Sequence, residues 1–311
     1  MNENKPLLSI CIPTYNRAEY LEKTLKSIIR QPEFNLENVE IIISDNCSSD
    51  TTKHLCESIS EKYANVKYFC NKENISDRNF SLVLGRASGV FRKLCNDTLI
   101  FNDGALGRLL IIAENEKNNK PVIFTTNRNC RDADTVISLE SFLYNVSYYI
   151  TWIGGVCIWG DDWDEFASSE EGCTEKLWQV PFLLRYISSR KKVLIYNQVL
   201  FTSQSVDKKN ISYGLYKVFY TNYLNYVRKY VDQGLVSTQC FEWLEKDLLY
   251  GFFSVWMINY EVNKNDFLYS QTEDLKKSIR DTYNNKSYYD SFCIFYKIKL
   301  IKAKIKKFLG I

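Results

Sequence analysis

The first 127 residues alternate short apolar runs with segments of helical periodicity, and this alternation limits the folds that the chain can adopt. The expected strands are residues 7–13, 39–44, 66–70 and 121–127, and residues 90–97 are expected to be a strand that meets an acidic turn. The helical segments between them are residues 17–30, 51–63, 77–88 and 105–115. Strands that alternate with helices form mostly parallel sheets, with right-handed crossovers that place helices on the faces of the sheet. We therefore expect an α/β fold, a Rossmann-like three-layer sandwich.

The second half of the sequence has a different texture. From about residue 130 the alternation weakens and longer aromatic segments follow. Residues 176–201 are typical of a helix followed by a strand, and residues 213–262 are typical of helices. The sequence contains no internal repeat and no long linker of Gly, Ser or Pro. We expect an integral lobe or a helical extension, not an independent module.

Charge is distributed unevenly along the chain. The whole sequence has a formal net charge of +3, whereas residues 276–311 hold ten Lys and Arg against two Asp. The body of the chain is therefore mildly acidic and the tail is basic. A general nucleic-acid-binding protein carries its basic face on the folded domain, so this pattern argues against that class.

The basic tail also has an apolar repeat. Ile294, Ile298, Ile301, Ile305 and Phe308 follow one another at spacings of four and three residues, and six lysines lie between them. This pattern predicts a basic amphipathic helix that lies on an anionic membrane surface. The alternative is a terminal helix that packs on the body or on a partner protein.

Two further features bear on location. Residues 141–160 contain no charge, but their polar and glycine residues make them less apolar than a membrane-spanning helix needs. The ten cysteines form no C-x-x-C pair, His54 is the single histidine, and the N-terminus lacks the pattern of a signal peptide. We therefore expect reduced thiols, no structural zinc and a cytoplasmic protein.

The polar ends of the expected strands are the candidate ligand site, because parallel α/β sheets bind ligands there. The first strand ends in PTYNR, where Asn16 is available to cap the following helix, and neither G-x-G-x-x-G nor a P-loop occurs in the sequence. This disfavours a dinucleotide oxidoreductase and a P-loop phosphotransferase.

Three segments, in this order, carry a resemblance to a known family: LSICIPTYNRAEYLEKTLKSI, EIIISDNCSSDTT and NISDRNFSLVLGRASGVFRKLCNDT. They resemble the nucleotide-binding half of the family 2 glycosyltransferases with the GT-A fold, of the bacterial surface-polysaccharide type that makes O-antigen or capsule. The resemblance covers about the first 127 residues.

The resemblance implies a division of the chain. Residues 1–127 are expected to be the nucleotide-sugar-binding half of the GT-A domain and residues 128–205 its acceptor-binding half. Residues 206–311 are expected to be a helical extension that ends in the basic amphipathic helix.

The resemblance also implies donor-binding residues. The end of the first strand contacts the base and ribose, the acidic residue after the second strand holds the uracil edge, and an arginine reaches the base or the diphosphate. The implied nucleotide-binding residues are Pro13, Thr14, Tyr15, Arg17, Asp45, Arg78 and Asn96, with Asp50 a further candidate. Each of these aspartates has an alternative role as a helix cap or turn former.

Asp97 is the implied ligand of Mg²⁺ or Mn²⁺. A hard cation held by carboxylate oxygen neutralises the charge that develops on a diphosphate leaving group. The acidic motif reads LCNDT here, so Asn96 stands where the family has a carboxylate, and Asp103 is the possible helper or else a helix cap. Because Mg²⁺ often uses one or two carboxylates together with phosphate oxygens, the substitution leaves metal binding possible in principle.

Transfer to an acceptor hydroxyl also needs a general base. We favour Glu175, because Thr174 can cap a helix and place Glu175 in its first turn, and then Asp164. The other acidic candidates in this region are Asp161, Asp162, Glu165, Glu170 and Glu171. Four tryptophans accompany them, Trp152, Trp159, Trp163 and Trp178, which stack on an acceptor sugar or pack in the core.

By resemblance the chain is an inverting, metal-dependent glycosyltransferase at the inner face of the cell membrane. Its donor is a nucleotide sugar, UDP-linked or otherwise, and its acceptor is a lipid-linked oligosaccharide of a surface polysaccharide such as lipopolysaccharide. Three alternatives stay open. They are a non-catalytic nucleotide-sugar or glycan-binding subunit, a nucleotidyltransferase and a membrane-surface scaffold.

Overall fold

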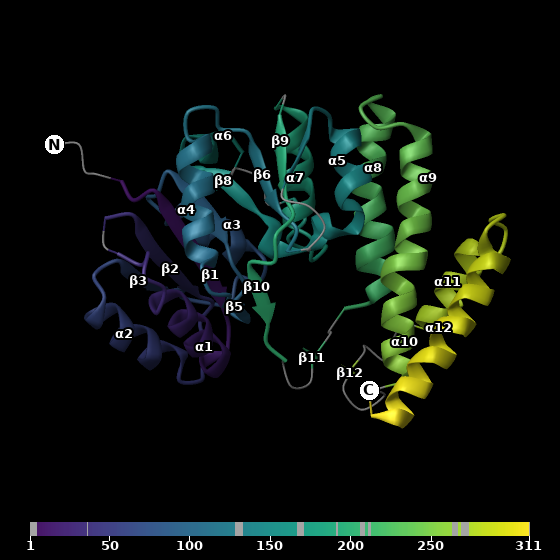
Figure 1. Cartoon of the computed structure of the whole chain (residues 1–311), viewed down its shortest axis with the longest axis horizontal. Coiled ribbons are helices and arrows are strands. Elements are labelled where there is room, and N and C mark those ends of the chain that lie inside the picture. The colour runs from purple at the N-terminus through teal and green to yellow at the C-terminus, as the bar shows by residue number, and fades with distance from the viewer. Residues whose placement is uncertain are drawn as a thin grey trace. The chain divides into compact units, whose positions relative to one another are not determined.

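The computed structural model describes residues 5–35, 37–127, 133–166, 171–190, 192–205, 209–210, 213–262, 267–268 and 274–310. The chain forms two compact units (Figure 1). The first consists of Met1–Phe142 and Tyr149–Ser205, and the second of Leu143–Tyr148 and Val206–Ile311.

A five-stranded sheet forms the centre of the first unit. Its strands, in spatial order, are β3 (Val66–Cys70), β2 (Val39–Asp45), β1 (Leu8–Thr14), β4 (Phe91–Leu94) and β8 (Cys157–Trp159). The first four are parallel, with Leu8 opposite both Val39 and Phe91, whereas β8 runs antiparallel to β4. The mostly parallel sheet expected from the alternating pattern is confirmed.

Helices cover both faces of this sheet (Figure 1). They are α1 (Ala18–Ile29), α2 (Thr52–Lys62), α3 (Arg78–Gly85) and α4 (Ala105–Glu116). Apolar side chains of α1, α2 and α4 share one core with the alternate residues Leu8, Ile10 and Ile12 of β1. Helix α3 contributes nothing to that core and contacts β1 and β2 from the other side. The three layers are therefore confirmed, and both faces of the sheet are buried as parallel strands require.

Two expected helix caps are wrong. Asn16 does not cap α1, because its side-chain oxygen accepts a hydrogen bond from the Ser49 N–H at 2.7 Å, in the loop after β2. Arg17 is the residue before α1 and makes no side-chain cap. Asp103 does not cap α4, since Gly104 precedes that helix with a φ of 73° and Asp103 pairs with Arg30 instead.

The rest of the first unit is built from short elements. Strands β6 (Val122–Thr125), β9 (Val193–Tyr196) and β7 (Ala133–Val136) form a small sheet in that order, and β5 (Leu99–Phe101) pairs with β10 (Phe201–Ser203). Helices α6 (Trp163–Phe166) and α7 (Gln179–Ser188) lie between β8 and β9 in sequence.

The uncharged stretch 141–160 is not one long helix. It passes through α5 (Leu139–Val146), the 3₁₀ turns η1 (Ser147–Thr151) and η2 (Ile153–Gly155), and β8. Among the residues that the structure describes, no helix has both the length and the apolarity to cross a bilayer.

The second unit is mostly helical, as the sequence predicts for residues 213–262. Its helices are η4 (Lys217–Asn222), α8 (Tyr223–Asp232), α9 (Thr238–Asp247), η5 (Leu248–Phe253), α10 (Ser254–Val262), α11 (Leu275–Tyr283) and α12 (Tyr289–Leu309). Helices α8 and α9 run side by side, and α12 packs on α10 (Figure 1). A two-residue pairing joins β11 (Lys209–Asn210) and β12 (Phe267–Leu268).

Candidate functional site

A pocket opens where β1 and β4 end. The residues that line it are Pro13, Thr14, Tyr15, Arg17, Asn46, Ser76, Asn79, Phe80 and Asp97. Strand β1 leads to β2 on one side and lies beside β4 on the other, so the strand order reverses here. Loops diverge at such a point and leave a crevice in which α/β sheets bind ligands. The pocket lies at the strand ends where the sequence places the candidate ligand site.

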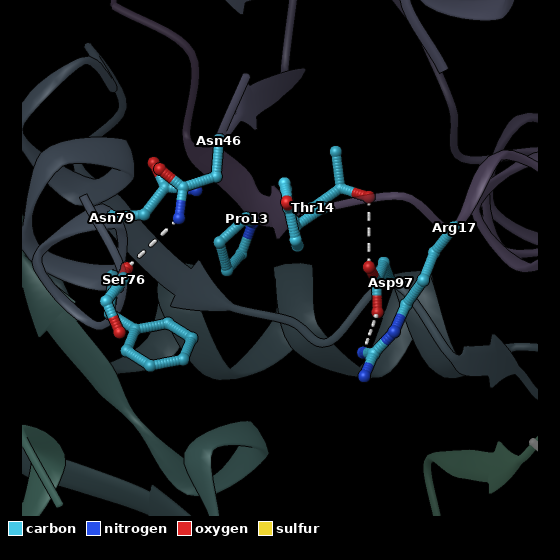
Figure 2. Close-up of a pocket in the computed structure, with 9 residues that line it drawn as sticks. Pro13, Thr14, Arg17, Asn46, Ser76, Asn79 and Asp97 are labelled. Carbon is cyan, nitrogen blue, oxygen red and sulfur yellow. Dashed lines mark hydrogen bonds and ion pairs between the residues drawn. The ribbon is translucent and has the colours of Figure 1, made fainter. Parts of the chain in front are cut away.

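Asp97 is the buried charged group of the pocket, with 3% of its surface exposed. Its Oδ1 accepts a hydrogen bond from Arg17 Nη1 at 2.9 Å, and its Oδ2 accepts one from the Thr14 hydroxyl at 2.9 Å (Figure 2). Burial raises the pKa of this carboxyl, against the opposing effects of Arg17 and Thr14. The Thr24 hydroxyl fixes the backbone by donating to the Asp97 carbonyl at 2.8 Å.

Amide side chains form the opposite side of the pocket. Figure 2 shows Asn46, Asn79 and Ser76 on one side of Pro13, with Thr14, Asp97 and Arg17 on the other. Asn46 donates to the Ser76 carbonyl at 3.3 Å and accepts from the Ile75 N–H at 2.9 Å, so it holds the loop before α3 against the end of β2. This network positions the loop that carries Ser76 into the pocket.

Four of the lining residues were not anticipated from the sequence: Asn46, Ser76, Asn79 and Phe80. Asn46 directly follows Asp45, and Asn79 directly follows Arg78, so each lies next to an implied donor-binding residue. The signal that would find the two asparagines is the single amide side chain in each of the motifs DNC and SDRNF, because buried amides at strand ends need specific partners.

Three implied donor-binding residues are outside the set that lines the pocket. Asp45 is fully buried, and its carboxylate accepts from the Ser48 N–H at 3.0 Å and from the Tyr68 hydroxyl at 2.9 Å. Arg78 is the exposed first residue of α3, which directs Asn79 and Phe80 into the pocket instead. Asn96 is half-buried in the turn after β4. Asp50 receives hydrogen bonds from backbone N–H groups at the starts of α1 and α2.

The side chains present do not form a prepared metal site. Within the described residues, no three His, Cys, Asp or Glu side chains gather into a metal-binding group. Both oxygens of Asp97 are engaged by Arg17 and Thr14. Asp103 is no helper ligand in this arrangement, because its largely exposed carboxylate pairs with Arg30 at 3.1 Å. A cation at Asp97 would compete with Arg17 for this carboxylate.

The candidate general bases lie outside the pocket lining as well. Glu175 is half-exposed in a turn, where its Oε2 accepts from the Thr174 hydroxyl at 2.7 Å. The expected helix start at Thr174 is wrong, because α7 begins at Gln179. The Leu177 N–H bonds to the Gly172 carbonyl at 2.9 Å and closes the preceding turn. Asp164 lies in α6, but its side chain is outside the described part of the structure.

Lys176 attaches the turn of Glu175 to the pocket. Its ammonium contacts the Ser76 hydroxyl and lies 3.4 Å from Asp77 Oδ1. Burial raises the pKa of the Asp77 carboxyl, and Lys176 opposes this effect. Lys176 has a φ of 62°. Residues other than glycine adopt this conformation rarely, and when they do, it is often at a functional site.

Three of the four tryptophans pack in the core. Trp159, Trp163 and Trp178 are buried, and Trp159 packs on Phe91 with the ring centres 4.7 Å apart. Trp178 lies 6.5 Å from Phe80, which does line the pocket. Of the two alternatives for the tryptophans, core packing therefore describes these three indoles, while Trp152 is half-buried.

Comparison with known proteins agrees with the fold. Residues 9–151 match the family model described as Glycosyl transferase family 2. This range includes every residue that lines the pocket. The chain thus carries a family 2 glycosyltransferase domain.

Curated relatives match over part of the chain. The chain is 46% identical over 85 residues to abequosyltransferase RfbV of Salmonella typhimurium, covering 27% of this chain and 25% of that protein. It is 36% identical over 107 residues to the GalNAc(5)-diNAcBac-PP-undecaprenol beta-1,3-glucosyltransferase of Campylobacter jejuni, covering 34% of each. The matches therefore span between a quarter and about a third of these relatives.

Solved structures share the fold over most of the chain. The S. aureus protein TarS 1-349 superimposes with a TM-score of 0.58 at 16% identity, covering 98% of this chain and 92% of that chain. The mannosyltransferase PcManGT from Pyrobaculum calidifontis, solved with GDP-Man and Mn²⁺, gives 0.53 at 13% identity, covering 98% and 87%. At such identities the likeness establishes the fold, and the expected GT-A architecture with helices at the C-terminal end is confirmed.

Proposed function

We propose that this protein transfers a sugar from a UDP-linked donor to a lipid-linked oligosaccharide in surface polysaccharide biosynthesis, with inversion at the anomeric carbon. The observation that carries the proposal is the pocket at the reversal of strand order, where buried Asp97 and half-exposed Arg17 meet. The pocket lies within the family 2 domain.

A nucleotide-sugar donor suits the chemistry of this pocket. The ring of Tyr15 is 44% exposed and offers a stacking surface for a base. The Arg17 guanidinium is a planar donor that matches diphosphate oxygens. Pro13, Thr14, Asp45, Arg78 and Asn96 are proposed to complete the contacts to the nucleotide. TarS, which shares the fold, has been solved in complex with UDP-GlcNAc and with UDP.

A divalent cation, Mg²⁺ or Mn²⁺, is part of the proposal only together with the donor, because Asp97 is paired with Arg17 in the structure described here. When bound, the cation would neutralise charge on the leaving diphosphate, with Asp97 as its protein ligand. Arg17 is positively charged both when it is paired with Asp97 and when it is released. Its release from Asp97 would place that charge close to the diphosphate.

Proton transfer completes the proposed reaction. Glu175, or Asp164 in second place, accepts the proton of the acceptor hydroxyl. The hydroxyl oxygen bonds to the anomeric carbon while the bond from that carbon to the diphosphate oxygen breaks, and the nucleoside diphosphate leaves. The attachment of the Glu175 turn to the pocket through Lys176 supports this assignment, because a general base must come within hydrogen-bond reach of the substrate.

The names of two relatives support the proposed acceptor and location. RfbV is named as an abequosyltransferase, and the Campylobacter protein is named for a substrate linked to PP-undecaprenol. We propose that this chain also uses a lipid-linked acceptor, and that it therefore lies at the inner face of the cell membrane.

A second candidate function is a non-catalytic subunit that binds a nucleotide sugar. Asn96 in place of a carboxylate and the occupied oxygens of Asp97 favour it. Such a protein would bind nucleotide but would release no free nucleoside diphosphate from any donor and acceptor.

Isothermal titration with UDP, GDP, CDP and dTDP, each with and without Mn²⁺, tests the donor site. We expect Mn²⁺-dependent binding of UDP that is lost in Asp97→Asn and kept in the matched surface variant Asp103→Asn. The absence of binding by all four nucleotides, with and without Mn²⁺, contradicts the donor-site assignment. Binding without turnover of UDP sugars on lipid-linked acceptors favours the non-catalytic subunit.

A further inference from the structure

Helix α12 has two apolar faces, and only one of them is used for packing. Phe292 is buried, and Tyr296, Leu300 and Ala303 are half-buried at spacings of four, four and three residues. These residues lie on one side of the helix, and the helix contacts α10. This face accounts for the attachment of α12 to the second unit.

The opposite side of α12 carries an exposed apolar stripe. Its members lie between 49% and 90% exposed, with Phe308 the most exposed. They are Ile294, Ile298, Ile301, Ile305 and Phe308. At about 100° per residue these five fall within a sector of about 80°, directed away from Phe292. Surface helices normally bury such a stripe, so a contiguous exposed one indicates a partner.

The charges beside the stripe restrict what can cover it. Lys297 and Lys304 follow one edge of the stripe and Lys302 follows the other, and all three are exposed. Residues 291–311 contain no Asp or Glu. Lysine stems can lie along an apolar surface while their ammonium groups reach phosphate oxygens above it. The apolar stripe with lysines on both edges is complementary to an anionic lipid surface, which offers acyl chains below a layer of phosphate.

We propose that the exposed stripe of α12 docks onto an anionic lipid bilayer, with the helix parallel to the membrane plane and Phe308 inserted among the acyl chains. A second copy of the chain fits less well, because two such faces would bring their lysine rows together. The inference rests on the membrane location within the proposed function and identifies the surface responsible. Its test uses neither nucleotide nor sugar, so its failure and a failure of the proposed function are distinguishable.

Co-sedimentation of the full chain with phosphatidylcholine vesicles, with or without phosphatidylglycerol, measures the docking. We expect binding to the anionic vesicles, weaker binding at high salt and little binding to phosphatidylcholine alone. The pair Lys302→Glu/Lys304→Glu should weaken binding about tenfold or more. The pair Ile301→Ser/Ile305→Ser should weaken it to a similar extent. The most exposed residue, Phe308, gives a single variant Phe308→Ser that is expected to fold normally and to bind less.

Matched variants separate docking from general surface chemistry. Ile111→Ser removes an isoleucine that is 60% exposed on α4, and Lys53→Glu/Lys62→Glu makes the same charge change on α2. Both should leave vesicle binding unchanged. The proposal is overturned if the full chain does not bind anionic vesicles at low salt, or if the α12 variants bind as well as the controls. It is also overturned if sedimentation velocity without lipid shows a dimer that the stripe variants dissociate.

Discussion

Arg17 and Asp97 form an ion pair of 2.9 Å whose two side chains differ sharply in exposure, 48% for the arginine and 4% for the aspartate. The carboxylate is fixed by the sheet and by Thr14, whereas the guanidinium at the start of α1 extends toward solvent. If a ligand competes for either charge of this ion pair, we therefore expect Arg17 to move and Asp97 to stay in place.

Replacing Arg17 tests this relationship. Arg17→Ala leaves the buried Asp97 carboxylate without its cation, so we expect a loss of about 1 to 2 kcal/mol of unfolding free energy, reduced by the exposure of Arg17. Arg30→Ala removes the exposed pair with Asp103 at 3.1 Å and should cost less than about 0.5 kcal/mol. Urea denaturation of both variants gives the comparison. Equal losses of unfolding free energy in the two variants would show that burial of Asp97 does not strengthen its ion pair with Arg17.

Asn46 connects the end of β2 to the loop before α3, and its substitution should loosen the pocket. Asn46→Ala deletes the hydrogen bonds to Ile75, Asn74 and the Ser76 carbonyl, at an expected cost of about 1 to 3 kcal/mol. Asn46→Asp retains an acceptor for Ile75 but cannot donate, so its loss should be smaller. Thermal denaturation and UDP titration report both effects. Full stability of Asn46→Ala would exclude a role for Asn46 in holding the loop.

The sheet was predictable because strand ends and crossovers leave local signals. The run 39–44 is mostly apolar, and the expected strand differs from β2 by one residue at its end. Helix caps were less predictable because the same side chains can serve other partners. Asn16 is of a residue type that caps helices, but its side-chain oxygen accepts a hydrogen bond from the N–H of Ser49, which is distant in sequence.

The candidate site was predictable where its residues lie at the ends of strands, and less predictable where they lie in loops that meet. Thr14 ends β1, Arg17 lies shortly after it, Asp97 lies shortly after β4, and all three line the pocket. Ser76 enters the pocket through a loop fixed by Asn46, and that long-range contact leaves no periodic signal in the sequence. The turn of Glu175 depends on a backbone closure between Gly172 and Leu177 that the helix-capping rule does not anticipate.

Asp77 gives a prediction for the dependence of stability on pH. Burial raises its pKa above the ordinary value of 3.8, with Lys176 opposing. A raised pKa in the folded state means that the neutral carboxyl favours folding below about 3.8 and that this contribution is lost as pH rises through the folded-state pKa. Relative to Asp77→Asn, the wild type should therefore lose stability as the pH rises from about 4 toward neutral. Denaturation across this range measures the difference. A difference that grows in favour of the wild type with rising pH would contradict the raised pKa.

Glu175 is the last residue to test, because its proposed role as a base separates catalysis from binding. Glu175→Gln removes proton acceptance but keeps the size of the side chain, so kcat should fall about a hundredfold or more while UDP affinity stays unchanged. Glu171→Gln makes the same change at an exposed position of the same turn and should keep the full rate. Lys176→Met should lower the rate less than Glu175→Gln, because it releases the turn from Ser76 and Asp77 without removing the base. Sugar transfer with UDP release provides the readout. If Glu175→Gln keeps the wild-type rate and Asp164→Asn does not, the base is Asp164.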